Sequence, residues 1–302
     1  MKILLIFQEI QLPPELLDTM VFILFSIVLL SLNNVLWKRN LKNTSIPFLM
    51  AYRAFFTSLI SFSVLFFSKD LSMIHSFPLA RVTLGSLFGV MGLFSMLIVI
   101  QKAPLQWMGI YSLIGVVFTA FYLYFFENLE LEKSILGMVL IVCGFIFYLI
   151  KNRETGYRLM FRQHLLLTSM IFCYGASSII HWKNLGESVP PVMVVLNQEL
   201  VVLFFSLIAT LMGMELRQFG INLKRNFSGV VIMALVIFLG LWCSFLGLKA
   251  TNPLISSVMF LANPLITIFF GTIFFKEKLS LSNAAAIVVI SLGSFLIHYG
   301  LG

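Results

Sequence analysis

Ten apolar stretches, each close to 20 residues long, follow one another along this chain of 302 residues, and the short segments between them hold nearly all of its charges. About 20 mostly apolar residues suffice for a helix to cross a bilayer. Only 11% of the residues are charged, against about 25% in a soluble domain. The sequence therefore predicts an all-α membrane protein with ten transmembrane helices, at residues 18–37, 46–68, 81–101, 104–126, 133–151, 164–181, 189–213, 227–248, 253–275 and 281–300.

Two segments lie outside these spans. Residues 1–17 are predicted to lie along the membrane interface, because Glu9 interrupts their apolar run and no small-residue cleavage site of a signal peptide is evident. The hydrophilic residues 152–163 fall close to the midpoint of the chain and are predicted to be a linker. This divides the chain into two five-helix units, residues 18–151 and 164–302.

The two units resemble each other in sequence. NNVLWKRNLKNTSIP (33–47) aligns with SSIIHWKNLGESVPP (177–191) at an offset of 144 residues, and FFENLEL (125–131) aligns with FFKEKLSL (274–281). Because five spans are an odd number, the units must enter the membrane from opposite sides. This predicts the inverted repeat of many secondary transporters, with a substrate site near the midplane between the halves.

The third and eighth spans also share a stripe of small residues, spaced so that two helices can approach closely in lipid. The stripes serve packing either within one chain or between chains, and they consist of Gly85, Gly89 and Gly92 in one span and Gly240, Ser244 and Gly247 in the other.

Several local patterns point to a known group of proteins. They are Pro47 followed by Arg53 in FLMAYRAFFTSLISF, the hairpin that includes Glu127 and Gly137, and FFKEKLSLSNAAAIVVISLGSFLI with Glu277 and Gly293. In these features the chain resembles the EamA-type ten-span members of the drug/metabolite transporter superfamily. The resemblance implies two five-helix halves and both termini in the cytoplasm. It selects no cargo, because such proteins move amino acids, drugs, nucleotide-like metabolites or sugars.

The chain departs from the pattern of that family in two places. The Trp-Gly pair that is frequent early in the first span is replaced by LLSLNNVLW, and only Tyr174-Gly175 in the second half is close to it. A proline is usual in the span before each acid; Pro264 supplies it in the second half, whereas the first half has Ile114-Gly115.

Arg53 is the clearest charged residue inside a predicted span. A charge at the bilayer centre costs at least about 2.5–3.5 kcal/mol, so such a residue usually faces a cavity or a partner. Arg53, Thr57 and Ser61 share one helix face. We predict that Arg53 and Thr57 line a substrate cavity in which Arg53 attracts an anionic group. The alternative is an arginine that snorkels to the membrane surface.

Asn197, Gln198 and Glu199 form a polar run inside the seventh span, and Asn197 aligns with Arg53 in the repeat. All three are candidate substrate-binding residues, although three consecutive residues spread over about 200° of a helix and cannot all face one cavity. Glu199 is predicted to line the cavity as a protonatable group, with Arg53 as its candidate partner. The alternative is a structural ion pair that joins the halves.

The first and sixth spans carry further candidate substrate-binding residues at aligned positions. They are Asn33, Asn34 and Trp37 in the first span and Ser177, Ser178 and His181 in the sixth. Amide and aromatic groups that converge on a cavity suit a small zwitterion or a flat metabolite. For Trp37, a place in the aromatic belt at the membrane interface is the alternative.

Several functions are disfavoured by what the sequence lacks. Its three cysteines lie in apolar runs without metal-ligand spacing, no phosphate-binding loop or HExxH motif occurs, and no basic run is interleaved with aromatic residues. We therefore expect no catalytic residues, no cofactor, no metal and no nucleic-acid partner. A lipid-linked carrier or flippase is the nearest alternative to a metabolite carrier; an intramembrane enzyme or a scaffold is more distant.

The leading hypothesis is a secondary transporter that moves small polar metabolites, such as amino acids, by alternating access around a central cavity in the inner, cytoplasmic membrane. Its expected partners are a small-molecule substrate and the lipid bilayer, with proton coupling as an open option and a monomer or a homodimer as the assembly. Import and export are not distinguished. Orientation stays open, because the loops after odd-numbered spans hold more Lys and Arg than the others, which contradicts cytoplasmic termini.

Overall fold

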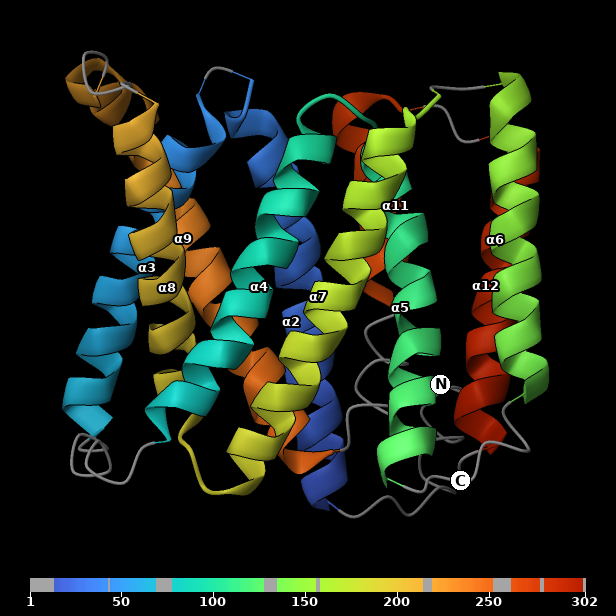
Figure 1. The fold of residues 1–302 in the computed structure, drawn as a ribbon, viewed down its shortest axis with the longest axis horizontal. Coiled ribbons are helices and arrows are strands. Elements are labelled where there is room, and N and C mark those ends of the chain that lie inside the picture. The colour runs from blue at the N-terminus through green and yellow to red at the C-terminus, as the bar shows by residue number, and fades with distance from the viewer. Residues whose placement is uncertain are drawn as a thin grey trace, which may run out of the picture.

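The computed structural model describes residues 14–42, 44–68, 78–127, 135–155, 158–213, 219–251, 262–277 and 280–300. Within these ranges the chain is all-α and forms ten helices (Figure 1). Their bounds are α2 Pro14–Asn40, α3 Ile46–Ser68, α4 Leu79–Ile100, α5 Leu105–Glu127, α6 Ile135–Thr155, α7 Phe161–Gly186, α8 Pro191–Met212, α9 Phe219–Ala250, α11 Ala262–Phe275 and α12 Leu281–Gly300. Residues 1–13 of the expected interfacial segment and the first part of the ninth predicted span lie outside the described residues.

Seven of these helices are long and apolar enough to cross a membrane, and three shorter apolar helices lie within α6, α11 and α12. Large apolar side chains stay exposed on their outer faces, for example Phe66, Phe125, Phe204 and Phe269. An outer surface with this much exposed apolar area is expected where lipid, rather than water, surrounds the protein.

The helices pack as four close pairs, α2 with α9, α4 with α7, α3 with α8 and α6 with α12. Small residues bring two of the pairs together. A Cβ atom on Gly92 of α4 would lie 2.9 Å from the ring of Tyr174 in α7, and one on Gly240 of α9 would lie 3.1 Å from Leu30 in α2. At these glycines the two small-residue stripes therefore face neighbouring helices of the same chain.

The pair α6 and α12 lies at one end of the molecule (Figure 1). A Cβ atom on Gly293 of α12 would lie 2.6 Å from the carbonyl oxygen of Gly137 in α6, and one on Gly144 would lie 2.7 Å from Ile290. Since the Gly293 contact is to backbone, no side-chain rotation can relieve it. The closest approach of these two helices thus requires glycine.

Glu277 connects three helices at the end of α11. Lys38 of α2 donates to Glu277 Oε1 at 2.6 Å and to the carbonyl oxygen of Ala103 at 3.1 Å. The same carboxylate accepts a hydrogen bond at 2.9 Å from the backbone N–H of Leu105, the first residue of α5. A carboxylate at a helix N-terminus satisfies a free N–H group and interacts favourably with the helix dipole. Glu277 therefore anchors α2, α5 and α11 to one another.

A second polar contact joins the start of α4 to the end of α7. Arg81 donates from Nε to Asn184 Oδ1 at 2.6 Å and from Nη2 to the carboxylate of Glu187, which follows α7. The ion pair is exposed, and exposed pairs contribute little to stability. The buried Asn184 is the more constrained partner.

The Glu187 ion pair predicts a small pH dependence of stability. The hydrogen bond from Arg81 and the charge of Arg81 hold the pKa of Glu187 below its usual value. The group therefore stabilises the fold above the ordinary glutamate pKa, and this contribution is lost as pH falls through the lowered pKa. In thermal unfolding measured in detergent over an acidic pH series, Glu187→Gln should remove that part of the acid dependence. An acid dependence identical to the wild type's would contradict the assignment.

Candidate functional site

A cavity of about 340 Å³ lies between the two halves of the chain. Eight helices, α2, α3, α4, α5, α7, α8, α9 and α11, contribute to its walls. Its size is near the lower end for small-molecule sites. The walls combine polar groups with methionine, leucine and aromatic side chains, and they consist of Leu30, Asn33, Asn34, Trp37, Arg53, Gly89, Leu93, Met96, Met108, Ser112, Gly115, Thr119, Met170, Ile171, Tyr174, Gly175, Ser177, Ser178, His181, Gln198, Glu199, Ile237, Leu241, Ser244, Phe245, Leu248 and Asn263.

Arg53 and Glu199 form an ion pair in the wall of this cavity. Arg53 Nη1 lies 3.0 Å from Glu199 Oε1 and 2.9 Å from Oε2, and each side chain is 1% exposed. Arg53 therefore does not snorkel to a surface, and the partner expected from the sequence is present. The Nε atom of Arg53 has no hydrogen-bond partner in the described structure, so the guanidinium retains one free donor.

Trp37 lies beside this ion pair. The guanidinium carbon of Arg53 is 5.4 Å from the centre of the Trp37 ring, and Trp37 is buried. A cation over an indole face is stabilised by the ring quadrupole. Trp37 consequently belongs to the cavity wall and not to an aromatic belt facing lipid.

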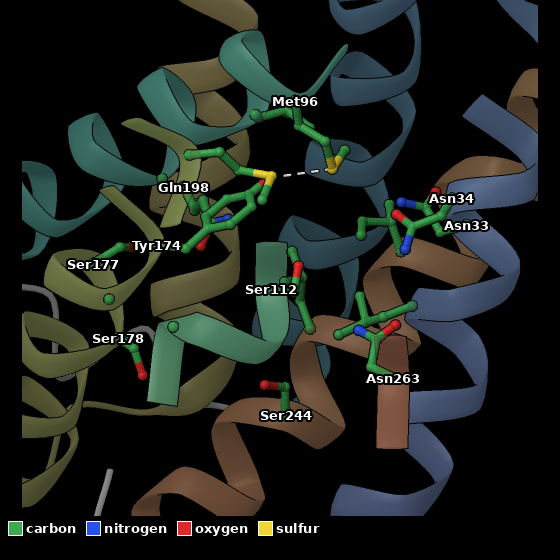
Figure 2. Close-up of a pocket in the computed structure, with 18 of the residues that line it drawn as sticks. Asn33, Asn34, Met96, Ser112, Tyr174, Ser177, Ser178, Gln198, Ser244 and Asn263 are labelled. Atoms are coloured by element: carbon green, nitrogen blue, oxygen red, sulfur yellow. Dashed lines mark hydrogen bonds between the residues drawn. The ribbon is translucent and has the colours of Figure 1, made fainter. Parts of the chain in front are cut away.

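Asn33 and Asn34 approach the cavity from α2, on the side opposite Tyr174 and Gln198 (Figure 2). The amide of Asn34 donates to Thr267 Oγ1 at 3.2 Å, and Thr267 donates to Asn263 Oδ1 at 3.1 Å. Asn34 is thus held by α11. By contrast, the buried Asn33 Oδ1 has no partner in the described part of the chain, which leaves it available to an occupant.

The sixth predicted span contributes Ser177, Ser178 and His181 from α7, and Figure 2 shows the two serines on the same side of the cavity as Tyr174. Ser177 lies against the backbone of Gly89, where a Cβ atom would be 3.3 Å from Ser177 Oγ. His181 is buried against Gly85 and Phe245. These side chains form the wall opposite α2.

Two of the candidate residues do not line the cavity. Asn197 turns towards α4, where it accepts from Ser86 Oγ at 2.7 Å and donates to Thr83 Oγ1 at 3.2 Å. Thr57 donates to the carbonyl oxygen of Arg53 at 3.0 Å, within its own helix. Gln198 and Glu199 line the cavity while Asn197 does not, which agrees with the wide angular spread of three consecutive helix positions.

Sequence reasoning missed the cavity residues that come from α4, α5, α9 and α11. Among them are Met96, Ser112, Ser244 and Asn263, together with Tyr174 on α7 (Figure 2). Tyr174 lies in the Tyr174-Gly175 pair of the family pattern and could have been found from it. Asn263 is an amide inside an apolar span and could have been found by the argument that was applied to Asn33. Met96, Ser112 and Ser244 are apolar or weakly polar residues in apolar spans, and nothing in the sequence sets which face of each helix points inwards.

The cavity carries little net charge. Among its described lining residues, Arg53 and Glu199 are the only Lys, Arg, Asp or Glu side chains, and they neutralise each other. No cluster of three or more possible metal ligands occurs among the described residues. The arrangement can therefore exchange one internal ion pair for contacts with a small molecule that carries both charges.

Apolar membrane-length helices around a buried cavity are the architecture of a polytopic membrane protein. The sequence model of the EamA-like transporter family matches residues 162–299 of this chain. The match places the protein in the drug/metabolite transporter superfamily, as the sequence patterns predicted. The protein is thus a multi-pass membrane transporter of that superfamily, whose members are transporters and not enzymes.

The remaining comparisons concern the fold alone. No curated protein matches the chain. A crystal structure of another protein is similar with a TM-score of 0.67 and 16% sequence identity, and the alignment covers 92% of this chain and 96% of that chain. The likeness shows that the two chains share a fold over nearly their whole lengths.

Proposed function

We propose that this protein is a secondary transporter of small polar metabolites, and in particular of zwitterions such as amino acids. It works by alternating access around the central cavity, in the inner, cytoplasmic membrane of the cell, through two inverted five-helix repeats that make ten spans. The observation that carries this proposal is the ion pair of Arg53 and Glu199, one residue from each half, buried in the wall of the cavity.

The helix contacts support the inverted repeat. In the proposed repeat, the first five helices, α2, α3, α4, α5 and α6, correspond in order to α7, α8, α9, α11 and α12. The contact between α2 and α9 then corresponds to the contact between α7 and α4, and the contact between α2 and α11 corresponds to the contact between α7 and α5. The pairs α3–α8 and α6–α12 each consist of two helices that correspond to each other. Each of these contacts thus has its counterpart in the fold, as two related halves facing each other require.

Two hydrogen bonds support the same relation at the level of single atoms. Lys38 Nζ donates to the carbonyl oxygen of Ala103, after α4, at 3.1 Å. Trp182 Nε1 donates to the carbonyl oxygen of Thr251, after α9, at 3.2 Å. Trp182 aligns with Lys38 at the 144-residue offset seen in the sequence, so aligned positions of α2 and α7 make the same contact with matched helix ends.

The charge of the cavity favours a zwitterion. A substrate with a single uncompensated charge would leave an unpaired ion in a low-dielectric site, which is costly. A zwitterion can place its carboxylate on Arg53 and its ammonium on Glu199, so that both charges stay paired. A phosphorylated metabolite would bring two negative charges to one arginine, so we propose that such compounds are rejected. Proton coupling, where it occurs, would use Glu199 after it separates from Arg53.

Counterflow into liposomes tests this proposal. Wild-type protein in liposomes preloaded with unlabelled L-serine or L-leucine should accumulate the labelled form well above protein-free liposomes. The methyl ester, which lacks the carboxylate, and the corresponding 2-hydroxy acid, which lacks the ammonium, should compete at least about tenfold more weakly, because each leaves one member of the pair unmatched. Equal competition by all three forms, or no accumulation of any amino acid tried, would contradict the proposal.

A further inference from the structure

We infer that His181 is a specificity-determining residue of this cavity, which selects zwitterions whose side chain carries a hydroxyl, an amide or a ring N–H over those with a purely apolar side chain. The inference rests on the proposed function, because it names the chemistry of the part of the substrate that the ion pair does not hold.

The imidazole of His181 is buried without a partner. His181 is 1% exposed and lines the cavity, yet neither Nδ1 nor Nε2 has a hydrogen-bond partner in the described structure. Nearly all buried polar groups in folded proteins are hydrogen-bonded, and an exception calls for an explanation. Two unpaired nitrogens on one cavity side chain are explained if the occupant supplies their partners.

The ring is also held in place from two sides. Phe245 of α9 meets it at a centroid distance of 5.3 Å and an interplanar angle of 69°. On the other side lies the bare backbone of Gly85, where a Cβ atom would be 2.8 Å from His181 Cε1. A ring fixed in this way holds the hydrogen-bonding directions of its two nitrogens constant. A fixed hydrogen-bonding group discriminates between ligands better than a mobile one, because it cannot turn away from a wrong partner.

The place of His181 fits recognition of a side chain. Ser177 and Gln198, the neighbour of Glu199, both approach Gly89 of α4, with Ser177 Oγ 3.3 Å and Gln198 Nε2 3.6 Å from the position of a Cβ atom there. His181 contacts α4 one helical turn away, at Gly85. This separates the imidazole from the level of Gln198 by roughly 6 Å. A zwitterion whose charged groups engage Arg53 and Glu199 can reach this distance with its side chain.

The chemistry of the imidazole defines what it selects. A neutral imidazole offers one donor and one acceptor, so it can pair with a hydroxyl, a carboxamide or a ring N–H. An apolar side chain of the same shape would leave both nitrogens buried and unsatisfied. The aligned position in the other half is Trp37, which has no acceptor and lies over Arg53. The two halves therefore supply different groups at matched places, and only His181 offers both a donor and an acceptor.

Matched pairs of amino acids test the inference. We would measure competition by L-valine and L-threonine, by L-leucine and L-asparagine, and by L-phenylalanine and L-tyrosine, which differ mainly in a hydrogen-bonding group. The wild type should prefer the polar member of at least one pair by roughly tenfold, the effect of one buried hydrogen bond. His181→Leu should reduce that ratio to about one, whatever its effect on the absolute affinities, and His181→Gln should restore part of it.

A second variant acts on the ring without removing it. Gly85→Ala places a methyl group where the imidazole now lies, so it should lower the same ratio while thermal unfolding shows a folded protein. Equal affinities within every pair in the wild type would overturn the inference but leave zwitterion transport standing. An unchanged preference in His181→Leu would also overturn it. If no amino acid competes at all, the proposed function itself has failed.

Discussion

Replacing Arg53 with methionine is expected to lower the free energy of unfolding by about 3–5 kcal/mol and to abolish substrate binding. The substitution leaves the carboxylate of Glu199, itself 1% exposed, without its cation. Removing one partner of a buried ion pair has a cost of this size, since the remaining charge is uncompensated. Thermal unfolding in detergent micelles would measure the stability, and ligand-induced stabilisation by amino acids would measure the binding.

The double variant Arg53→Met/Glu199→Leu separates a structural role from a functional one. Replacing a whole buried pair by apolar side chains is often neutral or stabilising, so the double variant should unfold close to the wild type. It should nevertheless fail to bind amino acids, because both charged contacts are gone. If the double variant binds as well as the wild type, the pair is a structural connection between the halves and the substrate is held elsewhere.

Gly293→Ala is expected to destabilise the protein by about 3 kcal/mol, since overpacking of a close contact costs up to about this amount. The added Cβ atom would lie 2.6 Å from the carbonyl oxygen of Gly137 and 3.0 Å from the backbone nitrogen of Ile141. Both are backbone atoms of α6, so α6 and α12 would have to move apart. Thermal unfolding in detergent and the yield of monodisperse protein would report the loss.

Gly186→Ala is the matched control for this prediction. Apart from its chain neighbours and the nearby backbone of its own helix, no atom of the described structure lies within 4 Å of the position of a Cβ atom on Gly186, the last residue of α7. The control should therefore be close to neutral. Equal stability of Gly293→Ala and Gly186→Ala would mean that the contact between α6 and α12 is looser than the structure has it.

The course of the helices could be predicted from the sequence because apolar runs of membrane length have few alternatives. Residues 46–68 are helical in the structure with the predicted bounds. Other ends were misplaced where charges begin: α9 starts at Phe219 instead of residue 227, and α7 continues past residue 181 to Gly186. The length of an apolar segment indicates where the lipid-embedded part of a helix ends. The helix itself can continue into the polar interface, because its backbone hydrogen bonds do not depend on apolar side chains.

The candidate site was accessible to the sequence where a charged or amide group interrupts an apolar span. Arg53, Glu199 and Asn33 could be found in this way, because a polar group inside lipid needs a cavity or a partner. The sequence could not assign Asn197 to α4 or bring Met96 and Ser244 to the cavity. Those placements depend on how each helix is rotated about its axis, which is set by contacts between residues far apart in the chain.

In the proposed repeat, the hydrogen bond that joins the end of α4 to α2 and the one that joins the end of α9 to α7 occupy equivalent places. Lys38 and Trp182 differ in charge, shape and size, yet each donates a hydrogen bond to a backbone carbonyl oxygen at the corresponding helix end. A residue-by-residue alignment scores this position as unrelated. A comparison based on hydrogen-bond donors and acceptors would score the position as identical, so it would test the proposed repeat where the residue types differ.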